Sequence, residues 1–381
     1  MSAHAEMGYE QRVTPLELFF DLVFVFAITR VTALMAHDLS WSSIGHGLLV
    51  LAALWWGWAA YAWLTNHVAG EDGPARLVVF LAMGAMVLVA LAVPEAFDAH
   101  ALLFALAYLV MRLAHLGLFW VSSRDVPEVH VAVATLLPTA VTGPLLLVAA
   151  AFTEGGVQAA LWIVALALDY GGPLVRGVAG YRMHPAHFAE RFSLIVIIAL
   201  GESIVAIGVG AGDEPLDLAI AVAAVLSLIT SAAMWWAYFD VVAPVSQRRL
   251  AELHGVARNT LGRDSFAYLH LPLIAGIELF ALGVEEVVGH VDEELPVEAA
   301  VALSGGVALY LLAHVAFRLR TFGNVNRQRL VAALLCLACL PLGTSVSALA
   351  ALAALTAITS ALIAYEAIRF RESRLRVRMA A

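Results

Sequence analysis

Three ionisable side chains interrupt the first long apolar segment of the chain, residues 15–36. Glu17 and Asp21 are four residues apart, so on a helix they lie about 40° apart and share one face. Arg30 is about 180° around the same helix from Asp21, and it is predicted to pair with an acid on another helix. Ionisable groups within a bilayer cost about 2.5–3.5 kcal/mol on insertion scales, so each is a functional candidate. The structural alternative is a buried pair that holds helices in register.

A glutamate flanked by small residues stands in the middle of another apolar segment, residues 190–211. Gly201-Glu202-Ser203 is followed by Gly208 and Gly210, and small residues let neighbouring helix backbones approach each other closely. A carboxylate at this depth is suited to binding a cation or carrying a proton. Glu202 is therefore the strongest single candidate. Glu190 is predicted to start the helix, where the helix dipole favours an acid, so it is interpreted as mainly structural.

Two further segments carry polar stripes at helical spacing. The first stripe comprises Tyr108, Arg112 and His115, and the second comprises Tyr310 and His314. Such stripes are expected to face protein or water and not lipid. Arg112 is predicted to pair with a carboxylate of another helix, for which Asp169 and Asp21 are the two candidates.

A histidine and a glutamate share the segment at residues 266–288. His270 and Glu278 are eight residues apart, about 80° around a helix. At different depths of a membrane they are suited to a proton relay. Two core groups with satisfied hydrogen bonds would give the same pattern, so both interpretations stay open.

Compact motifs for catalysis or for metal binding are absent from the sequence. Cys336 and Cys339 form a single CxxC inside an apolar segment, without a second pair or a nearby histidine, so they are interpreted as small apolar residues. The sequence has no HExxH, no Walker loop and no GxSxG. No cofactor and no metal ion are therefore predicted.

Composition defines the elements that must position these residues. Of 381 residues, 62% are apolar and 13% are charged, whereas soluble domains are near half apolar and a quarter charged. A membrane-spanning helix needs roughly 20 apolar residues. We therefore predict an all-α membrane protein with about twelve transmembrane helices at 15–36, 44–65, 77–94, 101–121, 131–152, 158–175, 190–211, 216–239, 266–288, 298–317, 329–345 and 348–368.

Arginine predicts the orientation of the chain. All 21 basic residues are arginines. With a cytoplasmic N-terminus, nineteen fall in cytoplasmic segments and two, Arg30 and Arg112, lie within helices. The outer loops instead carry acids, namely Asp213, Glu214, Asp217, Asp292, Glu293, Glu294 and Glu298. The positive-inside rule then predicts a multi-pass protein of the bacterial inner membrane with both termini cytoplasmic. The net charge of −9 is a property of the outer face and does not indicate a nucleic-acid partner.

Four short motifs recur in the same order, six predicted helices apart. They pair Glu17–Leu22 with Glu190–Ile195, Trp55-Trp56 with Trp235-Trp236, Leu113-Ala114-His115 with Leu312-Ala313-His314, and Leu137-Pro138 with Leu340-Pro341. Six is an even number, so the two halves, residues 1–175 and 176–381, are predicted to share one orientation about a pseudo-two-fold axis normal to the membrane. The tryptophan pairs are interpreted as aromatic belts at the membrane surface.

Several of these stretches also carry a family resemblance. Residues 17–28 (ELFFDLVFVFAI), 187–191 (HFAER), 197–204 (IIALGESI) and 235–239 (WWAYF) resemble the bacterial low-temperature-requirement A family over nearly the whole chain. The resemblance implies a membrane location and a growth phenotype in the cold, and it implies no reaction.

Duplicated helices, acids at mid-membrane and buried arginines together favour a transporter or channel for a small cation or protons, with a path between the halves. A membrane-embedded enzyme acting on a lipid or isoprenoid substrate is the alternative from a second class. A non-transporting structural or cold-adaptation protein is a third. Membrane lipids are the expected partners, and a homodimer is a further option. One observation would favour transport over the other two classes, namely that the carboxylates of the first, seventh and ninth segments line one hydrated cavity.

Overall fold

The computed structural model describes residues 13–67, 73–212, 216–372 and 374. Residues 1–12, 68–72, 213–215, 373 and 375–381 lie outside this part of the chain, and with them the predicted outer-loop acids Asp213 and Glu214. Every regular element in the described residues is helical. The first group comprises α1 (Pro15–His37), α2 (Trp41–Thr65), α3 (Gly73–Ala92), the 3₁₀ turn η1 (Val93–Glu95), α4 (Ala101–Ser122), α5 (Pro127–Ala150) and α6 (Gly155–Arg176). The second group comprises α7 (Pro185–Ala211), α8 (Leu218–Phe239), α9 (Val242–Glu252), α10 (Gly255–Leu261), the π turn η2 (Gly262–Tyr268), α11 (His270–Gly289), α12 (Val297–Ala300), the π turn η3 (Val301–Gly305), α13 (Gly306–Phe322), α14 (Arg327–Ala338), α15 (Leu340–Gly343) and α16 (Ala348–Arg369).

Ten helical spans among the described residues are long and apolar enough to cross a membrane. The predicted segments at 266–288 and 329–345 are not among them. The first contains α11, whose 20 residues include three glutamates. The second is divided into α14 and α15 at Cys339, two residues before Pro341, a residue that cannot donate a backbone hydrogen bond. The chain is therefore an all-α protein with many membrane-capable helices, and the count of twelve stays a prediction.

The start of α1 follows from its first residues. Thr14 accepts a hydrogen bond from the backbone N–H of Glu17, and the Glu17 carboxylate accepts one from the backbone N–H of Thr14. Pro15 occupies the first turn, where its missing N–H has no cost. Because this capping box fixes the beginning of the helix, it also fixes the position of the Glu17 carboxylate, which belongs to the candidate site below.

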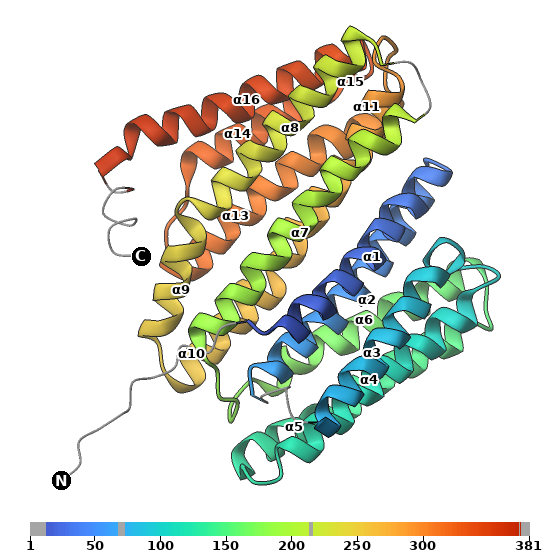
Figure 1. Ribbon diagram of the computed structural model, residues 1–381, viewed down its shortest axis with the longest axis vertical. Coiled ribbons are helices and arrows are strands. Elements are labelled where there is room, and N and C mark those ends of the chain that lie inside the picture. The colour runs from blue at the N-terminus through green and yellow to red at the C-terminus, as the bar shows by residue number, and fades with distance from the viewer. Residues whose placement is uncertain (1–12, 68–72, 213–215, 373, 375–381) are drawn as a thin grey trace.

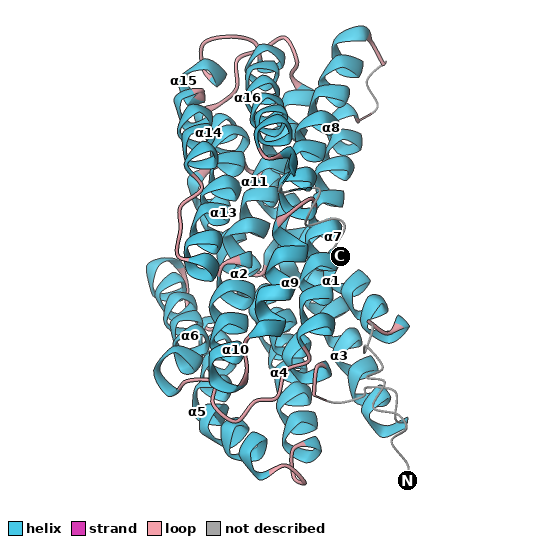
Figure 2. Cartoon of the chain, turned by 90° about the vertical axis from the view of Figure 1, so that its left-hand side faces the viewer, coloured by secondary structure: helices cyan, strands magenta, loops and turns pink. Residues whose placement is uncertain are grey.

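The helices form two groups that lie side by side, with α1 and α7 next to each other at the boundary (Figures 1 and 2). In the first group α3 packs on α4, α4 on α5, and α5 on α6. In the second group α11 packs on α13, α13 on α14, and α14 on α16. Between the groups, α1 and α2 of the first contact α7 and α11 of the second, and η2 bonds α2 and α6.

Glycines bring α11 and α13 into backbone contact. A Cβ atom added at Gly283 would lie 2.5 Å from the Cα of Leu303. One added at Gly276 would lie 2.7 Å from the carbonyl oxygen of Gly306, and one at Gly306 would lie 2.5 Å from the amide nitrogen of Phe280. Helix packing of this kind requires small residues. It holds α11, the carrier of Glu278, in the centre of its group.

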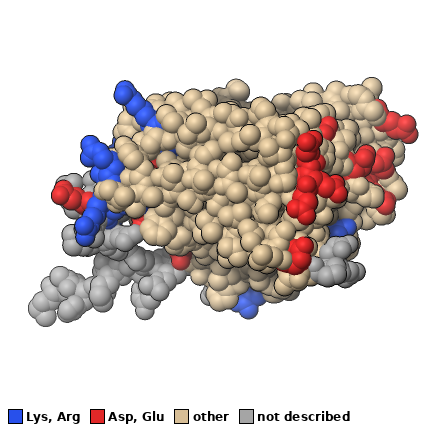
Figure 3. All heavy atoms as spheres, turned by 90° about the horizontal axis from the view of Figure 1, so that it is seen from above, with Lys and Arg blue, Asp and Glu red and all other residues tan. Residues whose placement is uncertain are grey.

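Charged residues gather at the two ends of the helices (Figure 3). On the face shown, arginines lie mostly at one end, the end at which α1 and α7 begin, and acids lie mostly at the other. We call these the arginine-rich end and the acidic end. The band between them is almost free of charged atoms on this face, as expected of a surface in contact with lipid tails.

The two tryptophan pairs differ in their surroundings. Trp235 and Trp236 are 44% and 39% exposed, as an aromatic belt requires. Trp55 is fully buried, and its indole N–H donates to the carbonyl oxygen of Ala267 at 2.7 Å. The belt interpretation is therefore wrong for Trp55, which joins α2 to the second group.

Candidate functional site

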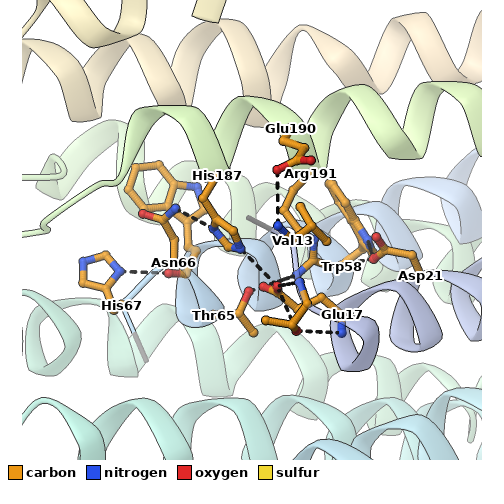
Figure 4. A network of polar contacts seen from close by, with 12 residues as sticks. Val13, Glu17, Asp21, Trp58, Thr65, Asn66, His67, His187, Glu190 and Arg191 are labelled. Carbon is orange, nitrogen blue, oxygen red and sulfur yellow. Dashed lines mark hydrogen bonds and ion pairs between the residues drawn. The ribbon is translucent and has the colours of Figure 1, made fainter. Parts of the chain in front are cut away.

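A buried group of polar side chains joins α1, α2 and α7, and we call it the arginine cluster (Figure 4). It consists of Glu17, Asp21, Trp58, His187 and Arg191. The Arg191 guanidinium donates to Glu17 Oε1 at 2.9 Å and to Asp21 Oδ1 at 2.6 Å. The indole N–H of Trp58 donates to the same Asp21 oxygen at 2.8 Å. Arg191 is 1% exposed and Asp21 is fully buried, so these ion pairs are shielded from solvent.

The amide of Asn66 determines the protonation of His187. The Oδ1 atom of Asn66 accepts the backbone N–H of His184 at 2.7 Å, and this bond orients the amide. Its Nδ2 atom, which can only donate, then lies 3.0 Å from Nδ1 of His187. His187 Nδ1 must therefore accept, and Nε2 carries the proton that it donates to Glu17 Oε2 at 3.0 Å. This arrangement holds His187 in its neutral form.

Charge in the arginine cluster is therefore unbalanced. Two carboxyls face a single arginine, because His187 is neutral in this arrangement. The second oxygen of Asp21, Oδ2, has no hydrogen-bond partner in the part of the chain that the structure describes. A cavity of about 10 Å³ borders Glu17, Thr65 and Arg191, which is room for one water molecule. Asp21 is consequently the group in this cluster that can hold a proton.

Asn66 and His67, which directly follow α2, lie beside the arginine cluster (Figure 4). His67 Nδ1 bonds the carbonyl oxygen of Trp63 at 2.9 Å, and Nε2 accepts the backbone N–H of Arg182 at 2.7 Å. Burial lowers the pKa of His67 to about 4, so this ring is neutral near pH 7 and Nε2 can accept that bond. The loop before α7 is thereby tied to the end of α2.

A second polar group lies further along α1, and we call it the glutamate cluster. Thr29 donates to Glu202 of α7 at 2.7 Å, and Thr32 donates to Glu278 of α11 at 2.9 Å. Glu202 is 5% exposed and Glu278 is fully buried. Glu278 Oε1 has no hydrogen-bond partner, and neither glutamate has an ion-pair partner, among the described residues. These two carboxyls are held by hydroxyls alone.

An apolar layer separates the two clusters. Asp21 and Thr29 are eight residues apart on α1, about 12 Å along the helix. Phe24 and Ile28 of α1 fill this interval and are 0% and 1% exposed. The carboxylates of α1, α7 and α11 thus lie at one interface, but in two groups and not along one continuous polar surface.

Other predicted groups lie away from this interface. Arg112 pairs with Asp169 at 3.2 Å, so the partner of Arg112 is the first of the two predicted candidates and not Asp21. His270 bonds the Tyr238 hydroxyl at 2.8 Å and the Ser265 carbonyl at 3.0 Å. These bonds join His270 to α8 and to η2, and Glu278 is not among its hydrogen-bond partners within the described residues.

Further candidate side chains, His115, His314 and Arg30, also keep polar atoms without a hydrogen-bond partner among the described residues. His115 and His314 are 6% and 1% exposed, and both ring nitrogens of each lack a hydrogen-bond partner among the described residues. Arg30 is partly buried, and the described residues do not provide the acid predicted to pair with it. Cys336 and Cys339 are buried free thiols.

Arg191 and His187 are not among the site residues predicted from the sequence. Arg191 is one of the arginines predicted to be cytoplasmic, whereas its side chain is almost fully buried. Their spacing of i and i+4 at the start of α7, which places both on one face, is the signal that could have identified them. Two basic side chains on one helix face and two acids on one face of α1 form a complementary pair.

Comparison with known proteins agrees with the helical architecture. The family described as bacterial low temperature requirement A protein matches residues 12–364, a range that contains both clusters. An uncharacterised protein of Rhizobium meliloti (strain 1021) is 31% identical over 306 residues, which cover 77% of this chain and 74% of that protein. The chain therefore belongs to the bacterial low temperature requirement A family of membrane proteins.

Proposed function

We propose that the protein moves protons or a small cation across the membrane along the interface of α1, α7 and α11. One observation carries the proposal. Four buried carboxyls, those of Glu17, Asp21, Glu202 and Glu278, lie at this interface, and Arg191 is the only arginine bonded to any of them within the described residues. A buried ionised carboxylate without a cation is costly, so the surplus acids must hold protons or cations.

The two clusters differ in how they can take part. In the arginine cluster, Asp21 has one oxygen bonded to Arg191 and Trp58 and one oxygen without a partner. In the glutamate cluster, each carboxyl is bound by a threonine hydroxyl, which can turn to donate or accept. Both arrangements let a carboxyl gain or lose a proton without loss of its hydrogen bonds.

The apolar layer around Phe24 and Ile28 is assigned the role of a gate. About 12 Å of helix separates the clusters, and a proton cannot pass this distance without water or a moving side chain. Apolar constrictions in channels control conduction by excluding water. Transfer between Asp21 and the glutamate cluster would therefore require this layer to hydrate or to rearrange.

The proposed arrangement in the membrane has twelve helices in two parallel halves. The order of helix contacts, which is alike in the two groups, supports this duplication. The separation of arginines and acids between the two ends supports an inner-membrane orientation with the arginine-rich end in the cytoplasm. The arginine cluster would then face the cytoplasm, and the glutamate cluster would lie near the membrane centre.

Ion flux into proteoliposomes tests the proposal directly. Wild-type protein is expected to carry flux under a gradient of K⁺, Na⁺ or H⁺. Flux of that same ion is expected to fall to the rate of empty liposomes in Glu202→Gln, Glu278→Gln and Asp21→Asn. The reason is that an amide cannot bind a cation by charge and cannot exchange a proton.

The matched control is Glu294→Gln, which neutralises an exposed acid at the acidic end. This variant should retain wild-type flux. Absence of flux for every ion with folded wild-type protein would reject transport. Equal flux in wild type and in all three neutralised variants would remove these acids from the path.

A further inference from the structure

A wide cavity opens at the arginine-rich end of the second helix group, away from the interface of the two groups. It has a volume of about 520 Å³ and is bordered by the start of α9 and by α13, α14 and α16. Its polar lining includes His314, Arg318, Arg329, Glu366 and Arg374. This region is separate from the arginine and glutamate clusters, and the proposed transport path does not use it.

The lining of this cavity has surplus positive charge. Arg329 and Glu366 form a pair with two bonds of 2.9 Å. Arg374 pairs with Asp240 at 3.0 Å. Arg318 bonds the neutral amide of Asn324, and it lies close enough to Arg329 for the two guanidiniums to repel each other. The three arginines and Glu366 of the lining, taken together with Asp240, which pairs with Arg374 from outside the lining, give a formal charge of +1.

One residue of the lining, His314, has no hydrogen-bond partner within the described residues. His314 is 1% exposed, and neither of its ring nitrogens has a partner within the described residues. Buried polar atoms in proteins are nearly always bonded, so an unbonded ring beside a cavity indicates that the cavity is normally occupied. The occupant must present an oxygen or another hydrogen-bonding atom.

The walls of the cavity are apolar on several sides. Val241 and Val245 at the start of α9, Phe317 and Phe322 of α13, and Phe370 line it. Free phosphate would gain nothing from such walls, whereas the glycerol and first methylenes of a lipid would be buried by them. The position at the end of the membrane-capable helices α13 and α16 is the level at which lipid headgroups lie.

We infer that this cavity binds the phosphodiester headgroup of an anionic phospholipid. The single negative charge of a phosphodiester neutralises the surplus charge of the lining. Its oxygens accept bonds from Arg318 and from unused N–H groups of Arg329 and Arg374, and His314 contacts the same headgroup. Arginine is the side chain best suited to phosphate recognition.

Lipid titration of the purified full-length protein tests this inference. Phosphatidylglycerol is expected to bind, observed as protein–lipid complexes in native mass spectrometry, and phosphatidylcholine is expected to bind at least about tenfold more weakly. Arg318→Gln should weaken phosphatidylglycerol binding about tenfold, the effect of one lost charge-assisted hydrogen bond. Arg318 is exposed and is bonded to a neutral partner, so this variant should fold.

Arg327→Gln is the matched control, because Arg327 is exposed at the same end of the molecule and does not line the cavity. It should bind phosphatidylglycerol as the wild type does. Val245→Trp, which fills the cavity without a change in charge, should weaken binding as Arg318→Gln does. Equal loss in Arg318→Gln and Arg327→Gln would overturn the site in favour of general surface attraction. Displacement of the lipid by millimolar inorganic phosphate would overturn the lipid as occupant.

Discussion

Replacing Arg191 with glutamine is expected to lower the free energy of unfolding by about 3–5 kcal/mol, because the change leaves two carboxyls buried without their cation. Arg191 is 1% exposed and bonds Glu17 and Asp21 at 2.9 and 2.6 Å. Denaturant unfolding of the protein in detergent measures the loss. The double variant Arg191→Gln with Asp21→Asn should recover part of it, since one of the two orphaned charges is then removed.

The control is an arginine–carboxylate pair at the surface. Arg182 and Glu128 lie 3.4 Å apart, and each side chain is 67% exposed. Arg182→Gln should change the free energy of unfolding by less than about 1 kcal/mol, the usual contribution of exposed pairs. If both arginine variants unfolded alike, burial would not be what makes the Arg191 pairs important.

Gly283→Ala is the second change with a large expected effect, a loss of about 3 kcal/mol. The added Cβ would lie 2.5 Å from Leu303 Cα and 2.6 Å from Leu303 N. These are backbone atoms of the η3 turn that leads into α13, so relief of the clash requires two whole helices to separate. The same unfolding experiment measures the loss.

Gly84→Ala is the control, for which no loss in the free energy of unfolding is expected. Gly84 lies inside α3, and an added Cβ would meet nothing within 4 Å. Alanine is the better helix former by about 1 kcal/mol, so this variant should be as stable as the wild type or slightly more stable. A comparable loss at both positions would show that the backbone contact of α11 with α13 does not limit stability.

Gly283 and Arg191 stabilise different parts of the helix packing around the glutamate cluster. The Gly283 contact holds α11, and with it Glu278, deep in the second group. The Arg191 pairs hold α7 against α1, and with it Glu202 beside Thr29. Loss of either support is therefore expected to disturb the glutamate cluster as well as the fold. Flux measurements on the Glu202→Gln and Glu278→Gln variants should therefore be made together with measurements of their free energy of unfolding.

Sequence alone determined the properties that depend on one helix at a time. Apolar length predicted membrane-capable helices, and ten such spans are present in the described residues. Helical periodicity placed Glu17 and Asp21 on one face of α1, and both contact Arg191. The cost of burying a lone arginine predicted a carboxylate partner for Arg112, which is Asp169.

Tertiary structure alone decided which helices meet and what they leave unpaired. The spacing within a helix states which face a side chain occupies, but packing over the whole fold sets how that helix is rotated against one 170 residues away. Glu17 therefore pairs with Arg191. His187 is neutral because the Asn66 amide, oriented by the backbone N–H of His184, donates to the ring nitrogen Nδ1. The separation of the acids into two clusters has the same origin, since Phe24 and Ile28 are apolar in any arrangement but become a buried layer between the acids only when the helices pack.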